Sequence, residues 1–502
     1  MKKLMTLALA AGMLLGAATG ASAIDFKAKG QWLMGFSAGD GSLVSHTKAK
    51  GASSNKAADT DDIFGASQRL RLQLDAVASE ALSGTVFFEI GDTYWGKAGN
   101  GGALGADQKI VELKNAYIDW MVPNTDLKFR MGIQGIQLPN VAGGSAILDD
   151  DVAAVTASYQ FNENVALTAM WARPYNDNYD ARADRTNYQD NMDLFALMVP
   201  LTFDGVKVTP WAMYGMAGAN ANTLTSTAPY ARYANGGDAF AFDPSSTSKA
   251  YGSMFWAGLP ISLTLWDPLN VELDINYGYV ESMGRYEAER YDNTFARMGD
   301  TKREGWLVKA LVEYKMDWGT PGIFGWYASG DDGNVKNGSE RMPSVSGCGN
   351  FMSFMGDGNY GWSTSDSLYD RNLTYAGTWG IGLRVHDLSF VEDLKHSFRV
   401  AYWGGTNSPS MAKYVGTSYG WQNFNNEKNF GEKDGPYLTT NDGLLEFNLV
   451  NSYQIYENLE ANLELGYIVN MVDDDTWKRS YRSDSYKKQD AWKAQLIFAY
   501  SF

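Results

Sequence analysis

Residues 491–502 read AWKAQLIFAYSF, and this stretch decides how the rest of the chain is interpreted. Its even positions, from Trp492 to Phe502, are all apolar or aromatic, whereas polar Lys493, Gln495 and Ser501 occupy half of the odd positions. Alternation with a period of two is typical of a β-strand that has one apolar face and one polar face. The stretch is therefore predicted to be a strand.

The same alternation recurs upstream, in residues 127–133, 271–279, 445–449 and 459–471. Only a short link containing Glu457-Asn458 precedes the last of these, and this is the length of a hairpin turn. Counting from Asp25 gives about 18 such segments of roughly 8 to 16 residues, with about 16 as the alternative count.

Short and long connections alternate between these segments. The short turns fall near 162–164, 204–205, 266–270, 317–321 and 456–458. The long connections are rich in Gly, Asn, Asp and Ser and cover 37–63, 92–109, 136–150, 174–191, 217–251, 283–303, 330–375, 404–440 and 472–489. A soluble β-sandwich or propeller would not require every second connection to be long, whereas outer-membrane barrels do. We therefore predict an all-β fold: a transmembrane antiparallel up-and-down β-barrel with long extracellular loops and, because 16 to 18 strands enclose a wide interior, a water-filled lumen.

Composition excludes several other classes. The net charge of −16 argues against a nucleic-acid-binding protein, because a phosphate backbone attracts a basic surface. One cysteine, Cys348, and three scattered histidines, His46, His386 and His396, leave little for a metal cluster or a Ser/His relay. The GxSxG string at 416–420 lies in a Gly/Asn/Ser-rich stretch and not between a strand and a helix. We therefore expect no enzyme activity, no metal and no cofactor.

The first segment resembles a secretory signal peptide. Lys2 and Lys3 precede an apolar run over 4–15, and Ala21-Ser22-Ala23 supplies the small residues of a cleavage site. A membrane anchor is the weaker interpretation, because the run is shorter than the roughly 20 apolar residues that span a bilayer. We expect cleavage after Ala23, with 1–23 as the signal peptide and 24–502 as the barrel domain.

These features together resemble the Gram-negative general porins, in which a C-terminal aromatic residue, here Phe502, is an assembly signal for the barrel assembly machinery. Three stretches resemble the outer membrane homotrimeric porins of sulfate-reducing bacteria more narrowly: SQRLRLQLDAVASEALSGTVFFEI at 67–90, IQLPNVAGGSAILDDDVAA at 136–154 and WARPYNDNYDARADRTNYQDNMD at 171–193. The resemblance implies a homotrimer in the outer membrane of a Gram-negative bacterium, in contact with lipid and lipopolysaccharide. Each barrel would pass small hydrophilic solutes.

The resemblance also implies that the third long loop, 136–150, folds into the lumen and carries an acidic lip at its end. The lip would consist of Asp149, Asp150 and Asp151. Alternation independently predicts a basic wall, because four cations alternate with Leu70, Leu72, Phe129 and Met131 and must face water if these apolar residues face lipid: Arg69, Arg71, Lys128 and Arg130. We hypothesise a transverse field between lip and wall that screens permeants by size and charge. In the alternative, the aspartates cap a solvated loop and the cations simply line the lumen.

Three functional classes remain. The first is a passive diffusion channel for small hydrophilic solutes and ions, and the second is a channel selective for small organic acids, anions or sugars. A selective channel would have an aromatic track, but alternation offers only Tyr117, Trp211 and Trp403 as inward aromatics. The third class, a barrel enzyme or adhesin, has no recognisable histidine set to support it. Ion preference is left open, because further inward cations offset the acidic loops: Lys27, Lys29, Lys207, Lys309, Arg384 and Arg399.

Overall fold

The computed structural model of the chain describes residues 24–41, 43–46, 63–107, 110–176, 191–218, 249–289, 295–347, 351, 359–364, 375–415, 437–477 and 486–502. The strands of its main sheet are β1 (Asp25–Asp40), β3 (Ile63–Ser79), β4 (Leu82–Tyr94), β5 (Val111–Met121), β6 (Leu127–Gln137), β7 (Asp149–Gln160), β8 (Ala166–Asn176), β9 (Asn191–Met198), β10 (Leu201–Phe203), β11 (Val206–Val208), β12 (Trp211–Gly218), β13 (Tyr251–Trp266), β14 (Leu269–Val280), β17 (Arg303–Tyr314), β18 (Thr320–Ala328), β19 (Thr378–Val391), β20 (Leu394–Gly405), β21 (Gly443–Tyr456), β22 (Leu459–Asn470) and β24 (Ala491–Ser501).

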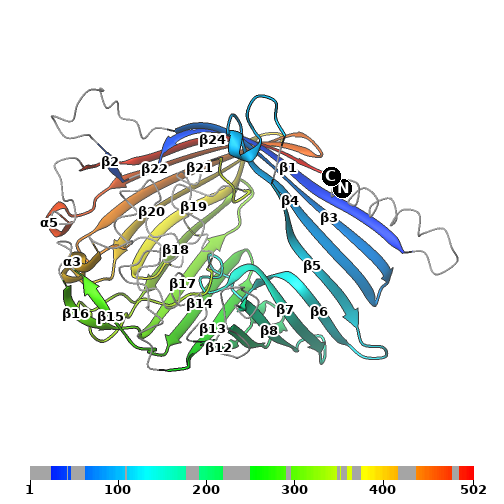
Figure 1. Cartoon of the computed structure of the whole chain (residues 1–502). Coiled ribbons are helices and arrows are strands. Elements are labelled where there is room, and N and C mark those ends of the chain that lie inside the picture. The colour runs from blue at the N-terminus through cyan, green and yellow to red at the C-terminus, as the bar shows by residue number, and fades with distance from the viewer. Residues whose placement is uncertain are drawn as a thin grey trace.

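These strands form one closed antiparallel ring (Figure 1). β10 continues the line of β9, and β11 continues into β12. The 20 strand segments of the sheet therefore form 18 strands of the barrel. The ring closes because β1 pairs with β3 on one side and with β24 on the other, Gln31 lying opposite Arg71 and opposite Ser501. The expected up-and-down barrel is confirmed, with 18 strands and not 16.

Short elements lie outside the ring. They are the pairs β2 (Val44–His46) with β23 (Tyr486–Lys488) and β15 (Arg285–Glu289) with β16 (Phe295–Asp300), and the helices η2 (Ala98–Asn100), η7 (Pro409–Met411), α3 (Ala412–Val415) and α5 (Asp474–Trp477). Across the described ranges, every helix is too short to cross a bilayer.

The connections alternate as the sequence predicts. Short turns join the strands at 161–165, 204–205, 267–268, 315–319 and 457–458, and turns at 80–81, 122–126 and 392–393 complete the set at one end of the barrel. Every connection at the other end is longer, and the connection between β18 and β19, which spans 329–377, is the longest. Both β1 and β24 have their free ends at the short-turn end.

The two faces of each strand differ in the way alternation requires. On β24, Trp492 and Tyr500 are partly exposed on the outside, while Lys493 and Gln495 on the inside are 2% and 0% exposed. The same holds on β19, where Ile381 and Leu383 face outward and are more than half exposed. The apolar surface of this molecule is therefore its outer wall, opposite to the arrangement of a water-soluble protein.

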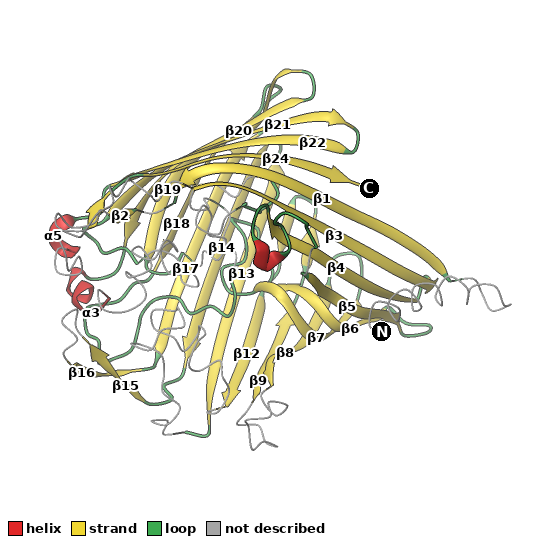
Figure 2. Ribbon diagram, turned by 45° about the horizontal axis from the view of Figure 1, so that its top comes forward, coloured by secondary structure: helices red, strands yellow, loops and turns green. Residues whose placement is uncertain are grey.

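A large apolar cluster lies inside the barrel, where the inner faces of the strands meet chain segments from the long connections. Figures 1 and 2 show such segments between the walls of the ring. The signal-peptide residues 1–23, Cys348 and the GxSxG string at 416–420 lie outside the described residues.

Candidate functional site

The segment 138–148, which joins β6 to β7, folds into the barrel. Leu138, Ala142 and Ile147 are at most 1% exposed. The Trp211 indole on β12 donates to the Pro139 carbonyl at 3.1 Å. The segment thus crosses the interior and packs on the wall beyond β8 and β9, as expected for the third long loop.

A buried ion pair on that wall holds the tip of segment 138–148. Asp274 on β14 accepts the backbone N–H groups of Val141 and Ala142 at 3.1 and 2.8 Å. Lys309 on β17 lies 3.4 Å from the same carboxylate and donates to the Gly144 carbonyl. The side chains of Lys309 and Asp274 are 0% and 2% exposed. The two opposite charges therefore neutralise each other, and each side chain also forms hydrogen bonds with the backbone of the loop. These bonds replace the hydrogen bonds to water that the two charged groups lose on burial.

A second connection, between β18 and β19, also enters the lumen, and its first part binds segment 138–148 directly. Val345 and Ser346 donate their N–H groups to the Ile147 carbonyl at 2.9 and 3.0 Å, and Asp149 donates to the Ser346 carbonyl at 2.7 Å. The Pro343 carbonyl accepts the indole N–H of Trp256 on β13 at 3.0 Å. The two connections therefore form one body against the β12 to β18 wall.

The described segment 359–364 of the same connection lies on the opposite wall. The Trp362 indole donates to Asp92 on β4 at 2.8 Å, and the Gln495 side chain on β24 accepts from the Thr364 N–H at 3.0 Å. In the ring, eight strands separate β1, which neighbours both β24 and β3, from β13 in either direction. One connection therefore has anchors on opposite sides of the lumen.

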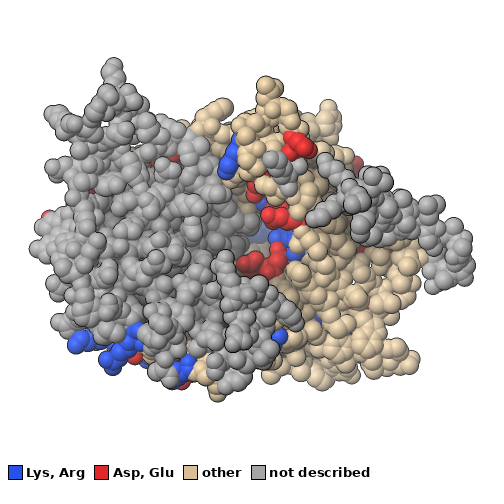
Figure 3. All heavy atoms as spheres, viewed as in Figure 1, with Lys and Arg blue, Asp and Glu red and all other residues tan. Residues whose placement is uncertain are grey.

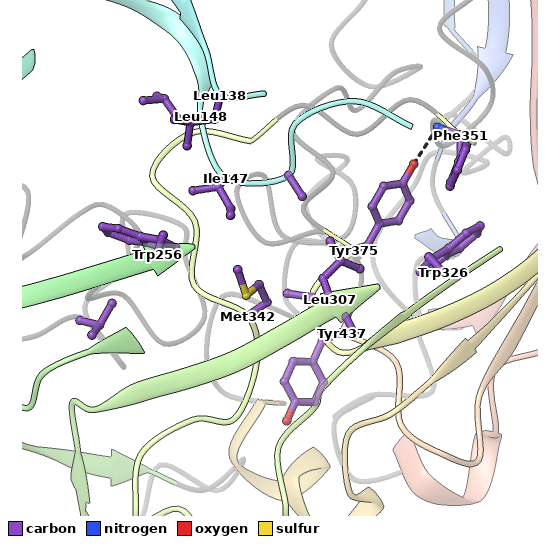
Figure 4. Close-up of a cluster of buried hydrophobic side chains, with 14 of the residues drawn as sticks. Leu138, Ile147, Leu148, Trp256, Leu307, Trp326, Met342, Phe351, Tyr375 and Tyr437 are labelled. Carbon is purple, nitrogen blue, oxygen red and sulfur yellow. Dashed lines mark hydrogen bonds between the residues drawn. The ribbon is translucent and has the colours of Figure 1, made fainter. Parts of the chain in front are cut away.

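More aromatic side chains lie inside the barrel than alternation alone predicts. Figure 4 shows Trp326 and Phe351 beside Tyr375, whose hydroxyl accepts the Phe351 N–H at 2.8 Å. Phe324 stacks on Phe351 with 5.1 Å between ring centroids, and Trp326 meets Trp403 edge-on at 4.6 Å. These rings are almost fully buried, so they form a core that fixes the inward segments and not an open aromatic track.

The predicted acidic lip requires a correction. Strand β7 begins at Asp149, so the three aspartates belong to a strand and alternate between its faces. Asp150 shares the inner face with buried Val152 and accepts the Ser346 hydroxyl at 2.8 Å. Asp149 and Asp151 lie on the other face, where Asp149 accepts from Gln137 at 2.7 Å and Asp151 pairs with Lys114. Only Asp150 can contribute to a lip inside the lumen.

The four predicted wall cations do lie on the inner face, and each interacts with nearby groups. Arg71 pairs with Glu89 at 2.6 Å. Arg130 forms a two-pronged contact with Asp119 at 2.8 and 2.9 Å, and Lys128 lies 3.9 Å from Asp119. The Arg69 guanidinium lies over the Trp362 ring, 5.5 Å from its centroid. None of the contacts described joins these cations to Asp149, Asp150 or Asp151, and the transverse field stays a prediction.

Further ion pairs continue around the inner wall. Arg384 on β19 lies 2.6 Å from Glu313 on β17, and His386 lies 3.0 Å from the same carboxylate. Lys493 and Glu464 form a second buried pair at 3.5 Å. Ion pairs therefore occur at several places along the inner wall, and Figure 3 shows acidic and basic side chains at the border of the hollow in the middle of the molecule.

Several residues of this site escape sequence reasoning. The alternation of apolar and polar residues predicts that Lys309 faces inward. No sequence pattern predicts that Asp274, opposite Lys309 on the neighbouring strand β14, binds the backbone of segment 138–148. The segment 359–364 is likewise missed, because nothing in a Gly/Asn/Ser-rich connection distinguishes a segment that folds inward from one that stays outside.

Comparisons with known proteins yield similarities of fold only. No family model and no curated protein matches the sequence. Among solved structures, the outer membrane protein OpdK from Pseudomonas aeruginosa is 11% identical, with 95% of this chain and 99% of that chain covered and a TM-score of 0.48. A BenF-like porin from Pseudomonas fluorescens Pf-5 is 9% identical, with 95% and 98% covered and a TM-score of 0.49. Pseudomonas aeruginosa OpdO is 12% identical, with 95% and 97% covered and a TM-score of 0.48.

Proposed function

We propose that this protein is an outer-membrane porin, a barrel channel through which small hydrophilic solutes and ions diffuse passively. The observation that carries the proposal is the closed barrel of 18 strands, with an apolar outer face and an inner face on which charged and amide side chains are frequent. A closed ring leaves no strand edge unpaired, so its backbone is satisfied within the hydrocarbon core of a bilayer.

The outer surface supports a membrane boundary near the long-connection end. Successive strand registers place a row of outward rings side by side: Trp171, Phe195, Tyr214, Phe255 and Tyr279. Arg173, Asp193 and Glu281 each lie two residues beyond a ring of this row and form ion pairs. Arg173 pairs with Asp193 at 2.8 Å, and Glu281 pairs with Lys249, which precedes β13. The hydrogen bond from Lys249 keeps the pKa of Glu281 below its usual value, so this carboxylate is charged. Rings at the interface and charges beyond it match an aromatic girdle below lipid headgroups.

The charge balance of the lumen supports passive diffusion. Arg71, Arg130, Arg384 and Lys493 each have a carboxylate partner, so these four cations add polarity to the wall with little net charge. The polar groups of such a wall can form hydrogen bonds with solutes in place of water. A wall with little net charge repels neither cations nor anions strongly. The inward segments then limit passage by size.

The finer parts of the proposal rest on the sequence. The signal peptide at 1–23 would direct export and be removed by cleavage after Ala23, and the barrel assembly machinery would recognise Phe502. Assembly as a homotrimer, contact with lipopolysaccharide, and kinship with the porins of sulfate-reducing bacteria follow from the resemblance of the three stretches at 67–90, 136–154 and 171–193.

Liposome swelling tests the proposal. The refolded protein is reconstituted, and entry of sugars and organic acids of graded size is followed by light scattering. A smooth decline of rate with solute size is the expected result. A saturable preference for one solute would instead establish the substrate-selective channel, and an absence of swelling with every solute would contradict a channel of either kind.

A further inference from the structure

The segment 359–364 is bound to the β1, β4, β22 and β24 wall by side chains that recognise its backbone. Gln495 on β24 donates to the Trp362 carbonyl at 2.9 Å and accepts from the Thr364 N–H at 3.0 Å. The single side-chain amide of Gln495 therefore bonds the carbonyl of Trp362 and the N–H of Thr364, which are backbone groups that a neighbouring strand would otherwise pair with. Gln495 is 0% exposed and also donates to Glu464 at 3.0 Å, which fixes its orientation.

Trp362 occupies a prepared place on the same wall. Its indole donates to Asp92, the Arg69 guanidinium lies over its ring, and the side chain is 3% exposed. The ring fits because β1 has a glycine beneath it: a Cβ added to Gly35 would lie 2.8 Å from Trp362 Cζ3 and 2.6 Å from Thr364 Cγ2. Hydrogen bond, cation–π contact and shape therefore all select this position.

Contacts to two further strands extend the binding. Asn359 donates to Asn462 on β22 at 2.9 Å and to Ser452 on β21 at 2.5 Å. The Thr364 hydroxyl contacts the Ser37 hydroxyl on β1. Segment 359–364 thus makes polar contacts with five strands of the wall, and several of the partners are buried. These contacts hold the segment firmly on the inner wall.

We propose that segment 359–364 is a second, fixed constriction of the channel, and that Trp362 and Gln495 are the residues that position it and so help set the size limit for permeants. Segment 138–148 narrows the lumen from the β12 to β17 wall, and segment 359–364 narrows it from the opposite wall. This inference rests on the proposed channel function. It assigns the size limit of the channel to segments 138–148 and 359–364 together.

Single-channel recording in planar bilayers tests the role of Trp362. Trp362→Ala should raise conductance about twofold, because the open cross-section of a pore sets its conductance, and should admit larger sugars in liposome swelling. Trp362→Phe keeps the ring but loses the N–H, so its effect should be smaller. Folding of each variant is checked by the heat-dependent electrophoretic mobility of a closed barrel.

Gly35 supplies an independent test that leaves the loop sequence unchanged. Gly35→Val should displace the indole and the Thr364 methyl group and so alter conductance in the wild-type background. It should have no further effect in Trp362→Ala with Thr364→Ser, which removes both side-chain groups that the valine would meet. Gly65→Val on β3 is the matched control, because an added Cβ there meets nothing within 4 Å. An equal effect of Gly35→Val in both backgrounds, or wild-type conductance in Trp362→Ala, overturns the proposal.

A crosslink distinguishes a fixed constriction from a gate and remains informative if a Trp362 variant fails to fold. Ser37→Cys with Thr364→Cys, in a Cys348→Ser background, would tie the segment to β1 on oxidation. Equal open-state conductance with and without reductant supports a fixed element. Loss of conductance on oxidation would show that the segment leaves the wall during conduction and contradicts the proposal. Absence of conductance in the wild-type protein would instead contradict the channel function itself.

Discussion

At the scale of single residues, the buried pair Lys309–Asp274 has the largest expected effect on stability. Lys309→Met leaves the Asp274 carboxylate buried without its cation, which costs about 3–5 kcal/mol. We expect the urea-induced unfolding midpoint, followed by tryptophan fluorescence, to fall accordingly. Lys395→Met is the control, because Lys395 and its partner Asp387 are mostly exposed and such pairs contribute about 1 kcal/mol or less.

The double variant Asp274→Asn with Lys309→Met removes both charges and keeps a side-chain oxygen that accepts the Val141 and Ala142 N–H groups, so it should recover much of the loss. A double variant as unstable as Lys309→Met alone would mean that the pair acts through something other than its charge balance.

Asp442 should make stability depend on pH. Burial raises the pKa of this carboxylate, although Thr439, Asp473 and Trp477 all donate to it and oppose the shift. A raised pKa means that the folded state holds a proton which the unfolded state has released, so this contribution is fully present below pH 3.8 and declines as pH rises through the folded pKa. The melting temperature of wild type relative to Asp442→Asn should therefore be highest in acid and decline as pH rises. A difference that stays constant with pH would contradict this assignment.

At the scale of elements, the seam between β1 and β24 depends on one glycine. Gly30 donates to the Phe502 carbonyl at 2.8 Å and accepts the Phe502 N–H at 3.0 Å. A Cβ on Gly30 would lie 2.6 Å from Phe502 Cζ and 2.8 Å from the Arg71 carbonyl oxygen. We expect Gly30→Val to reduce the yield of barrel that resists SDS without heating. Gly65→Val should leave that yield unchanged, and a similar loss in both variants would show that the seam is not specially sensitive.

Strand faces and turn positions could be predicted from the sequence because both depend on local pattern. Lys493 and Gln495 alternate with Trp492 and Leu496, and the structure places the two sets on opposite faces. The predicted acidic lip is wrong for Asp149 and Asp151, because strand β7 begins at Asp149, inside the predicted loop 136–150, and puts these two side chains on the outer face. One residue of register decides which face a side chain takes.

The inward course of segment 359–364 could not be predicted because its partners are far away in sequence. Gln495 is separated from Trp362 by 133 positions, and its pairing with that backbone has no periodic signature. Alternation predicts the wall cations, but which carboxylates pair with them, Glu89 and Asp119, becomes clear only once the strand registers are known.

At the scale of the whole molecule, the paired charges of the lumen predict weak ion selectivity. The reversal potential across a KCl gradient should lie near zero for the wild-type channel. Arg130→Ala removes the closer of the two cations at the Asp119 carboxylate, leaving only Lys128, and should shift the ion preference toward cations. Arg173→Ala is the matched control, because Arg173 pairs with Asp193 on the outer face. A shift of equal size in Arg173→Ala would mean that the wall facing the lumen does not determine ion preference.

The pairing of β1 with β24 also dictates an order of events during biogenesis. Met34 lies opposite Phe498, so the first and last strands meet only after the intervening polypeptide has been delivered to the site of assembly. Until then both strands are unpaired edges that can recruit other chains. Contacts between residues so distant in sequence also form slowly. A cell that makes this protein must therefore protect a nearly complete but open sheet from pairing with other chains. This protection is no longer needed once β1 and β24 have paired.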